Sequence, residues 1–80
     1  MTIGDLIKNK DYDYIEYRIA LLDPRFTEPI FAGVCESKNG KLISLDGDSY
    51  SEDEEVIRFE EWSSVAVRNG LTVVVEGEVL

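Results

Sequence analysis

The chain has 80 residues, and its 17 acidic side chains against eight basic ones give a formal net charge of −9. A chain of this length has room for one small core, so residues 1–80 are expected to form a single domain. The apolar fraction of 44% argues against disorder. The negative charge repels nucleic acid and anionic membranes, which excludes direct binding to either and predicts a basic protein as partner.

Cysteine content and the amino-terminal residues bear on the cellular compartment. Cys35 is the only cysteine, so the chain cannot form an internal disulfide, as is typical of reducing compartments. The first ten residues lack the basic start and long apolar run of a secretory signal, and the sequence has no apolar run of membrane-spanning length. These features predict a cytoplasmic protein.

A short helix is expected at the amino terminus. Thr2 and Asp5 have the spacing of a capping box, and Ile3, Leu6 and Ile7 fall on one helical face. Because about two helical turns are not stable alone, this apolar face is expected to pack on a sheet.

The apolar period changes to two after Asp13, which predicts a half-buried strand. Its inward face is expected to hold Ile15, Tyr17, Ile19 and Leu21, and its outward face Tyr14, Glu16 and Arg18. Asp23 and Pro24 end this strand, and a second strand, apolar on both faces, is expected from Ile30 to Cys35. Four aromatic side chains fit the core pattern: Tyr17, Phe31, Phe59 and Trp62.

Two Asn-Gly pairs predict hairpins with two-residue type I′ turns, because both residue types tolerate positive φ. Asn39-Gly40 separates the second strand from residues 41–45. Asn69-Gly70 separates residues 64–68 from residues 71–75. A turn at the second pair sets Arg68 opposite Leu71, Ala66 opposite Val73 and Trp62 opposite Gly77, and without a bulge the strand extends back to Val56.

Residues 46–49 are expected to link the two halves, and Ser51 with the four acids that follow it is expected to form either a loop or a first helical turn. The predicted fold is therefore α+β: a short amino-terminal helix packed on a curled antiparallel sheet of about five strands.

The residue types argue against catalysis. The sequence has no histidine, which removes the usual base at neutral pH, and Cys35 lies among apolar neighbours. Glu60 and Glu61 are adjacent on a predicted strand, so they point to opposite faces and cannot act on one substrate. The protein is expected to act without enzymatic activity and without a cofactor.

Metal binding is a second class to weigh. Asp46-Gly47-Asp48 resembles the start of a calcium-binding EF-hand loop, because calcium requires several oxygen ligands within one turn. The third ligand position holds Tyr50, the position of the required glycine holds Ser51, and the position of the closing glutamate holds Ile57, so the motif does not fit. The segment is interpreted as a solvated turn with no metal site.

The acids concentrate in one stretch of sixteen residues, where eight carboxylates accompany a single base, Arg58. Such a stretch could form a surface that binds a basic partner, with exposed tyrosines as aromatic contacts. The alternative is that the acids only keep the protein soluble and protect sheet edges. The predicted partner-binding residues are Asp46, Asp48, Glu52, Asp53, Glu54, Glu55 and Glu60, together with Tyr12, Tyr14 and Tyr50.

Three segments, residues 41–50, 60–62 and 70–75, carry a resemblance over the whole chain to small acidic proteins encoded in phages and mobile elements of gut Firmicutes. Residues 3–12 are also similar to the opening of an acidic anti-CRISPR inhibitor of Cas9. That resemblance implies a compact, non-enzymatic inhibitor whose carboxylates occupy the groove in which the nuclease holds DNA.

Charge and resemblance together predict a phage or mobile-element protein that inhibits a host nucleic-acid-binding defence enzyme, such as a CRISPR nuclease. The alternative is a structural or accessory module that binds through a sheet edge or a dimer face. Monomer and homodimer both remain open.

Overall fold

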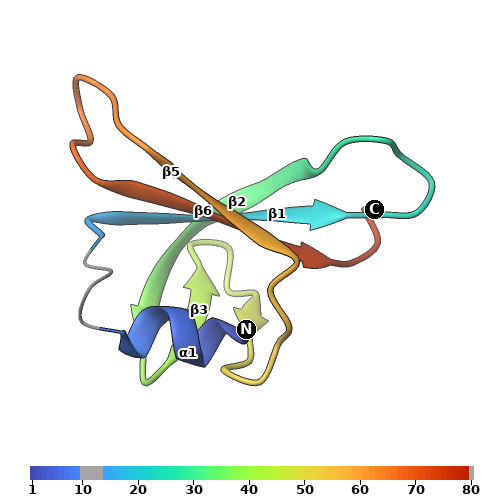
Figure 1. Ribbon diagram of the computed structural model, residues 1–80, viewed down its shortest axis with the longest axis horizontal. Coiled ribbons are helices and arrows are strands. Elements are labelled where there is room, and N and C mark those ends of the chain that lie inside the picture. Colours follow the sequence, from blue (N-terminus) through green and yellow to red (C-terminus); the bar gives the residue numbers. More distant parts are fainter. Residues whose placement is uncertain (10–13, 80) are drawn as a thin grey trace.

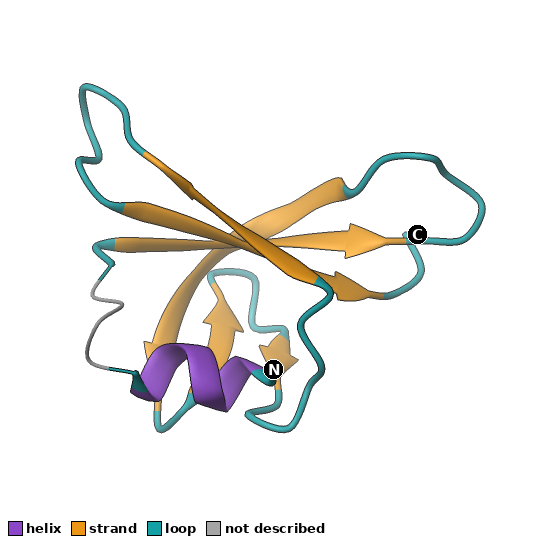
Figure 2. Cartoon of the chain, viewed as in Figure 1, coloured by secondary structure: helices purple, strands orange, loops and turns teal. Residues whose placement is uncertain are grey.

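The computed structural model describes residues 1–9 and 14–79, which form one helix and six strands (Figure 1). The elements are α1 (Ile3–Lys8), β1 (Glu16–Leu22), β2 (Ile30–Lys38), β3 (Lys41–Ser44), β4 (Ser49–Tyr50), β5 (Arg58–Trp62) and β6 (Gly70–Glu76). The strands form one twisted sheet in the order β4-β3-β2-β1-β6-β5, and α1 lies against one face of it (Figure 2).

The capping box at the start of α1 is confirmed. The Asp5 amide donates to Thr2 Oγ1 at 3.2 Å, and the Thr2 amide donates to Asp5 Oδ2 at 3.0 Å. Ile3 and Leu6 are fully buried against the sheet, as their helical spacing indicates.

The prediction of an antiparallel sheet is wrong at its centre, because β1 and β6 are parallel neighbours. Their register pairs Tyr17 with Leu71 and Ile19 with Val73. Every other strand pair is antiparallel. Parallel strands require a crossover between them, and here the intervening chain forms four further strands before it returns to β1 as β6. The α+β class holds, with six strands in an open mixed sheet.

The two Asn-Gly pairs have different surroundings. Between β2 and β3, Lys38 pairs with Lys41, and Asn39 and Gly40 both have positive φ, 53° and 82°. The second pair does not form a two-residue turn, since Trp62 pairs with Gly70 and residues 63–69 make a longer connection.

The predicted register of the last two strands is therefore wrong. Residues 64–68 are not a strand, because the Ser64 and Val67 backbones close a local turn through a 2.6 Å hydrogen bond. The indole of Trp62 lies on Gly70, where a Cβ atom would overlap it. Val56 and Ile57 precede β5, which begins at Arg58.

The core lies between α1 and the face of the sheet that α1 covers. Its buried members come from the helix, from four strands and from the segment before β5, and they are Ile3, Leu6, Tyr17, Ile19, Cys35, Leu42, Val56, Leu71, Val73 and Val75. On the opposite face, which α1 does not cover, the Arg18 guanidinium stacks on Trp62 at 4.0 Å and approaches Phe31 at 5.9 Å. Ala20 and Val74, which are paired neighbours on β1 and β6, are also buried.

Several side chains depart from the predicted core pattern. Phe31 is 55% exposed, because a bulge in β2 at Ala32 sets it beside Ala20 on the uncovered face. Ile15 is exposed, and Tyr14 packs against Tyr17 instead of pointing outward. Because β1 begins only at Glu16, the alternation of the strand does not extend to either residue.

Candidate interaction surface

Residues 51–57, which we call the acidic link, are fixed to the amino end of α1 by backbone hydrogen bonds. The Ile3 and Gly4 amides donate to the carbonyl oxygens of Glu54 and Glu52 at 2.9 and 2.8 Å. These two amides belong to the first helical turn and have no partner within the helix. The link is consequently a loop that caps α1, and the helical turn considered from sequence does not form.

Two carboxylates of the link are paired within the molecule. Lys8 Nζ donates to Glu52 at 2.7 Å, and the Met1 ammonium donates to Glu55 at 2.9 Å. The Glu52 carboxylate raises the pKa of Lys8, and Lys8 lowers the pKa of Glu52. These cations lie far from the acids in the sequence, so the two ion pairs could not be predicted from it. Glu52 and Glu55 are therefore not free surface charges.

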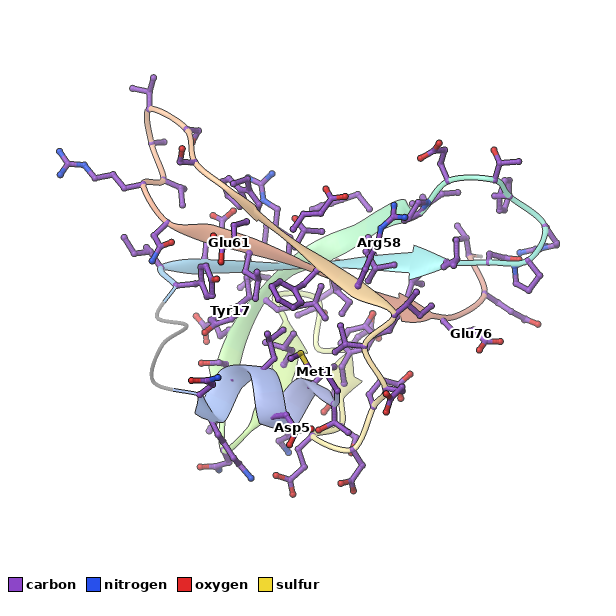
Figure 3. All side chains as sticks on the ribbon, in the orientation of Figure 1. Met1, Asp5, Tyr17, Arg58, Glu61 and Glu76 are labelled. Carbon is purple, nitrogen blue, oxygen red and sulfur yellow. The ribbon has the colours of Figure 1, made fainter. Side chains whose placement is uncertain are left out.

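Glu60 and Glu61 project from opposite faces of β5, as adjacent strand residues must. Glu60 lies 3.8 Å from Arg58, and Glu61 accepts a 2.6 Å hydrogen bond from the Tyr14 hydroxyl. Figure 3 shows that Arg58 and Glu61 lie on the upper part of the molecule, whereas Met1 and Asp5 lie below the sheet. The stretch does not form one continuous anionic ridge.

Four predicted site carboxylates form no ion pair with the described residues. Within the described part of the chain, no cation lies within 4.0 Å of the carboxylates of Asp46, Asp48, Asp53 or Glu54. Asp46 and Asp48 occupy the turn between β3 and β4, and Asp53 and Glu54 follow in the acidic link. All are exposed except Glu54, which is half-buried.

The three predicted tyrosines have different environments. Tyr12 lies outside the described residues. Tyr14 is half-buried: its ring packs against the core and its hydroxyl donates a hydrogen bond to Glu61. Tyr50 is half-buried at the sheet edge, where burial and then the negative charge of Asp48 raise its pKa.

An open pocket of about 460 Å³ lies between the start of β2, the edge strand β4 and the carboxy-terminal segment. We call it the β2–β4 pocket. Its lining combines apolar and acidic side chains from five segments: Leu21, Ile30, Phe31, Ala32, Asp48, Ser49, Tyr50, Glu78 and Val79. Sequence reasoning missed Glu78 and the pocket, because only the fold brings Asp48 and Glu78 into one lining.

Across residues 1–9 and 14–79, no group of three or more acidic or cysteine side chains is arranged to hold a metal ion. The Cys35 thiol is 4% exposed, and burial followed by the charge of Asp48 raises its pKa to about 11. No helix in the same residues is long and apolar enough to cross a membrane.

Cys35 is expected to resist a thiol-reactive dye in the folded protein. At pH 8 a thiol with this pKa is ionised to only about one part in a thousand, and the thiolate is the reactive form. Labelling followed by absorbance should be at least 100-fold slower in buffer than in about 8 M urea. Equal rates in the two solvents would contradict the burial of Cys35.

Comparison of the chain with models of protein families, with curated proteins and with solved structures found no match.

Proposed function

We propose that this protein acts without a cofactor or chemistry of its own, by binding a basic protein through its unpaired carboxylates. The supporting observation is that Asp46, Asp48, Asp53 and Glu54 have no cation of the described chain within ion-pair distance. Neighbouring carboxylates repel one another, and a cationic partner would relieve that repulsion. Complementary potentials would also speed association.

The partner class that we propose is a nucleic-acid-binding enzyme of the cytoplasm. Such enzymes carry basic grooves for phosphates, and carboxylates can occupy a groove in the place of phosphates. In this form the protein is a phage or mobile-element inhibitor of a defence nuclease. The contact would involve two separate groups of acids, the β3–β4 turn and the acidic link, instead of all eight carboxylates of the stretch.

Removing three of these carboxylate charges is expected to weaken partner binding at least fivefold. The test variant is D46N/D53N/E54Q, and the control is E28Q/E36Q/E76Q, which removes three other acids and leaves the same net charge. Each protein is immobilised and exposed to bacterial lysate proteins eluted from heparin. The parent and the control should retain proteins that elute as NaCl rises from about 0.1 to 0.5 M, because surface charge pairs are screened. The test variant should retain at least fivefold less.

Equal retention by the test variant and the parent would contradict the proposal. Equal loss in the test and control variants would also contradict it, since total charge alone would then explain retention. The inhibitor form has a separate readout: the parent should inhibit DNA cleavage by a guide-loaded Cas9-type nuclease, and the test variant should not. If the parent protein does not inhibit cleavage, Cas9-type nucleases are excluded as the partner.

A second candidate function is an accessory module that binds through the uncovered sheet face. The observation that favours it is the exposure of two apolar side chains, Phe31 on that face at 55% and Ile57 just before β5 at 48%. Binding of this kind would be insensitive to salt. Retention that persists at about 0.5 M NaCl and is lost in F31S/I57S would favour this function over the first.

A further inference from the structure

The β2–β4 pocket has the form of a site for a long side chain with a positive end. Leu21, Ile30 and Ala32 supply apolar surface on which an alkyl stem can lie. Asp48 and Glu78 supply two carboxylates in the same lining. Its volume of about 460 Å³ lies within the usual range of ligand pockets.

The Arg25 guanidinium reaches the pocket lining at the Val79 carbonyl oxygen, 2.6 Å away, and is itself ion-paired with Asp23. In the described residues, neither Asp48 nor Glu78 has a cation within 4.0 Å, and both are exposed. The effect of Asp48 reaches deeper groups, because its negative charge contributes to the raised pKa of Tyr50 and of Cys35. A cation in this pocket would therefore meet a negative potential next to apolar surface.

The adjoining end of β2 has backbone available for a neighbouring strand. The ladder between β2 and β3 covers Cys35 to Lys38, whereas the ladder between β2 and β1 continues to Ile30. In the described structure, Ile30, Phe31 and Gly33 thus pair with β1 alone, and Ala32 is the bulge residue between them. Three of these four residues, Ile30, Phe31 and Ala32, also line the pocket. An extended segment can add to such an edge through main-chain hydrogen bonds.

We propose that the β2–β4 pocket receives a lysine or arginine side chain from an extended segment of the basic partner, while the segment's backbone pairs with β2 at residues 30–33. Charge complementarity identifies the ligand. The carboxylates of Asp48 and Glu78 favour a cation, and the apolar part of the lining favours a side chain with a long alkyl portion. This inference rests on the proposed function in one respect, that the partner is basic.

The test uses a short acetylated and amidated peptide in which valines and threonines flank one central lysine. The matched peptide carries norleucine, which keeps the stem and removes the charge. Peptide is titrated into ¹⁵N-labelled protein, and amide shifts are followed by NMR. The lysine peptide should shift the amides of Ala32, Ser49 and Val79, and it should bind at least fivefold more tightly than the norleucine peptide.

Two variants separate the pocket from general charge. D48N/E78Q removes both pocket carboxylates and should weaken binding of the lysine peptide at least fivefold. E36Q/E76Q removes one acid from β2 and one from β6, neither of which lines the pocket, and should leave binding within about twofold of the parent. Equal weakening in both variants would overturn the inference, as would equal binding of the two peptides or shifts confined to other residues.

Failure of this inference is distinguishable from failure of the proposed function. Suppose that D46N/D53N/E54Q loses the heparin-eluted proteins while the lysine peptide does not bind to the parent. This result would support the proposed function and contradict the inference about the pocket. If the peptide binds in the pocket while D46N/D53N/E54Q retains the heparin-eluted proteins, the result would support the inference about the pocket and contradict the proposed function.

Discussion

Replacing Gly70 with alanine is expected to destabilise the protein by about 1–2 kcal/mol. A Cβ at this position would overlap the indole of Trp62, which lies on the glycine across the β5–β6 pair. Overpacking of this kind costs about 1–3 kcal/mol. Alanine also restricts the unfolded chain, which stabilises by about 0.4–1 kcal/mol, so the overlap decides the sign. Urea unfolding followed by far-ultraviolet circular dichroism measures the difference.

Gly77 provides the matched control for this substitution. A Cβ at Gly77 would meet only the end of the Leu21 side chain, at 3.0 Å, and that side chain can move. We expect Gly77→Ala to change stability by less than about 0.5 kcal/mol. The pair of variants also tests register, because the sequence pattern placed Gly77, not Gly70, opposite Trp62. A harmful Gly77→Ala with a neutral Gly70→Ala would contradict the observed register.

The overlap can be isolated with a double-mutant cycle. In a Trp62→Leu background the indole is absent, so Gly70→Ala should have little effect on the free energy of unfolding. A loss that remains as large as in the parent would show that the glycine is required for a reason other than Trp62. Trp62→Leu should itself destabilise the fold, because the indole also carries the Arg18 guanidinium at 4.0 Å.

Replacing Asp23 with asparagine is expected to lower the thermal midpoint by roughly 5–10 °C. Asp23 is 1% exposed and joins the loop after β1 to the carboxy-terminal segment. Its carboxylate accepts hydrogen bonds from the Arg25 amide at 2.9 Å, from the Arg25 guanidinium at 2.6 Å and from the Val79 amide at 3.0 Å. Removing the charge weakens all of them and releases the carboxy-terminal segment that borders the β2–β4 pocket.

The effect of Asp23→Asn should depend on pH. The Arg25 guanidinium, the Arg25 amide and the Val79 amide hold the pKa of Asp23 well below its usual range. Because the folded-state pKa is depressed, the stabilisation is complete above the unfolded pKa of about 3.9 and is lost as the pH falls below it. The difference in midpoint between parent and variant should be constant from pH 5 to 7 and shrink below about pH 4.

Glu28→Gln serves as the control, since Glu28 is an exposed acid in the same loop as Asp23. Scanning calorimetry should show a change of no more than about 2 °C for this variant. A loss that is as large for Glu28→Gln, or one for Asp23→Asn that persists undiminished at pH 2.5, would contradict the assigned role of Asp23.

The candidate site shows where charge counting stops being informative. The sixteen-residue concentration of acids was evident from composition, and so was the opposite projection of Glu60 and Glu61 from a strand. Internal pairing was not, because Lys8 and Met1 meet Glu52 and Glu55 across 44 and 54 residues of chain. The same applies to the β2–β4 pocket, whose carboxylates lie 30 positions apart in sequence.

The sequence alone determined the features that depend only on residues close together in the chain. Thr2 and Asp5 cap α1, Asn39 and Gly40 adopt positive φ between β2 and β3, and Tyr17 and Ile19 alternate into the core. Each of these features follows from local hydrogen bonding, backbone sterics or side-chain period.

Only the tertiary structure decided the parallel pairing of β1 with β6 and the placement of Trp62 on Gly70. The preference of Asn69-Gly70 for a two-residue turn arises only from the backbone conformations of these two residues. It was overridden by a large indole that fits only over a residue without a side chain, and by the burial of β6 between β1 and β5. Contacts between distant segments depend on packing the whole core, and no short window of sequence contains that information.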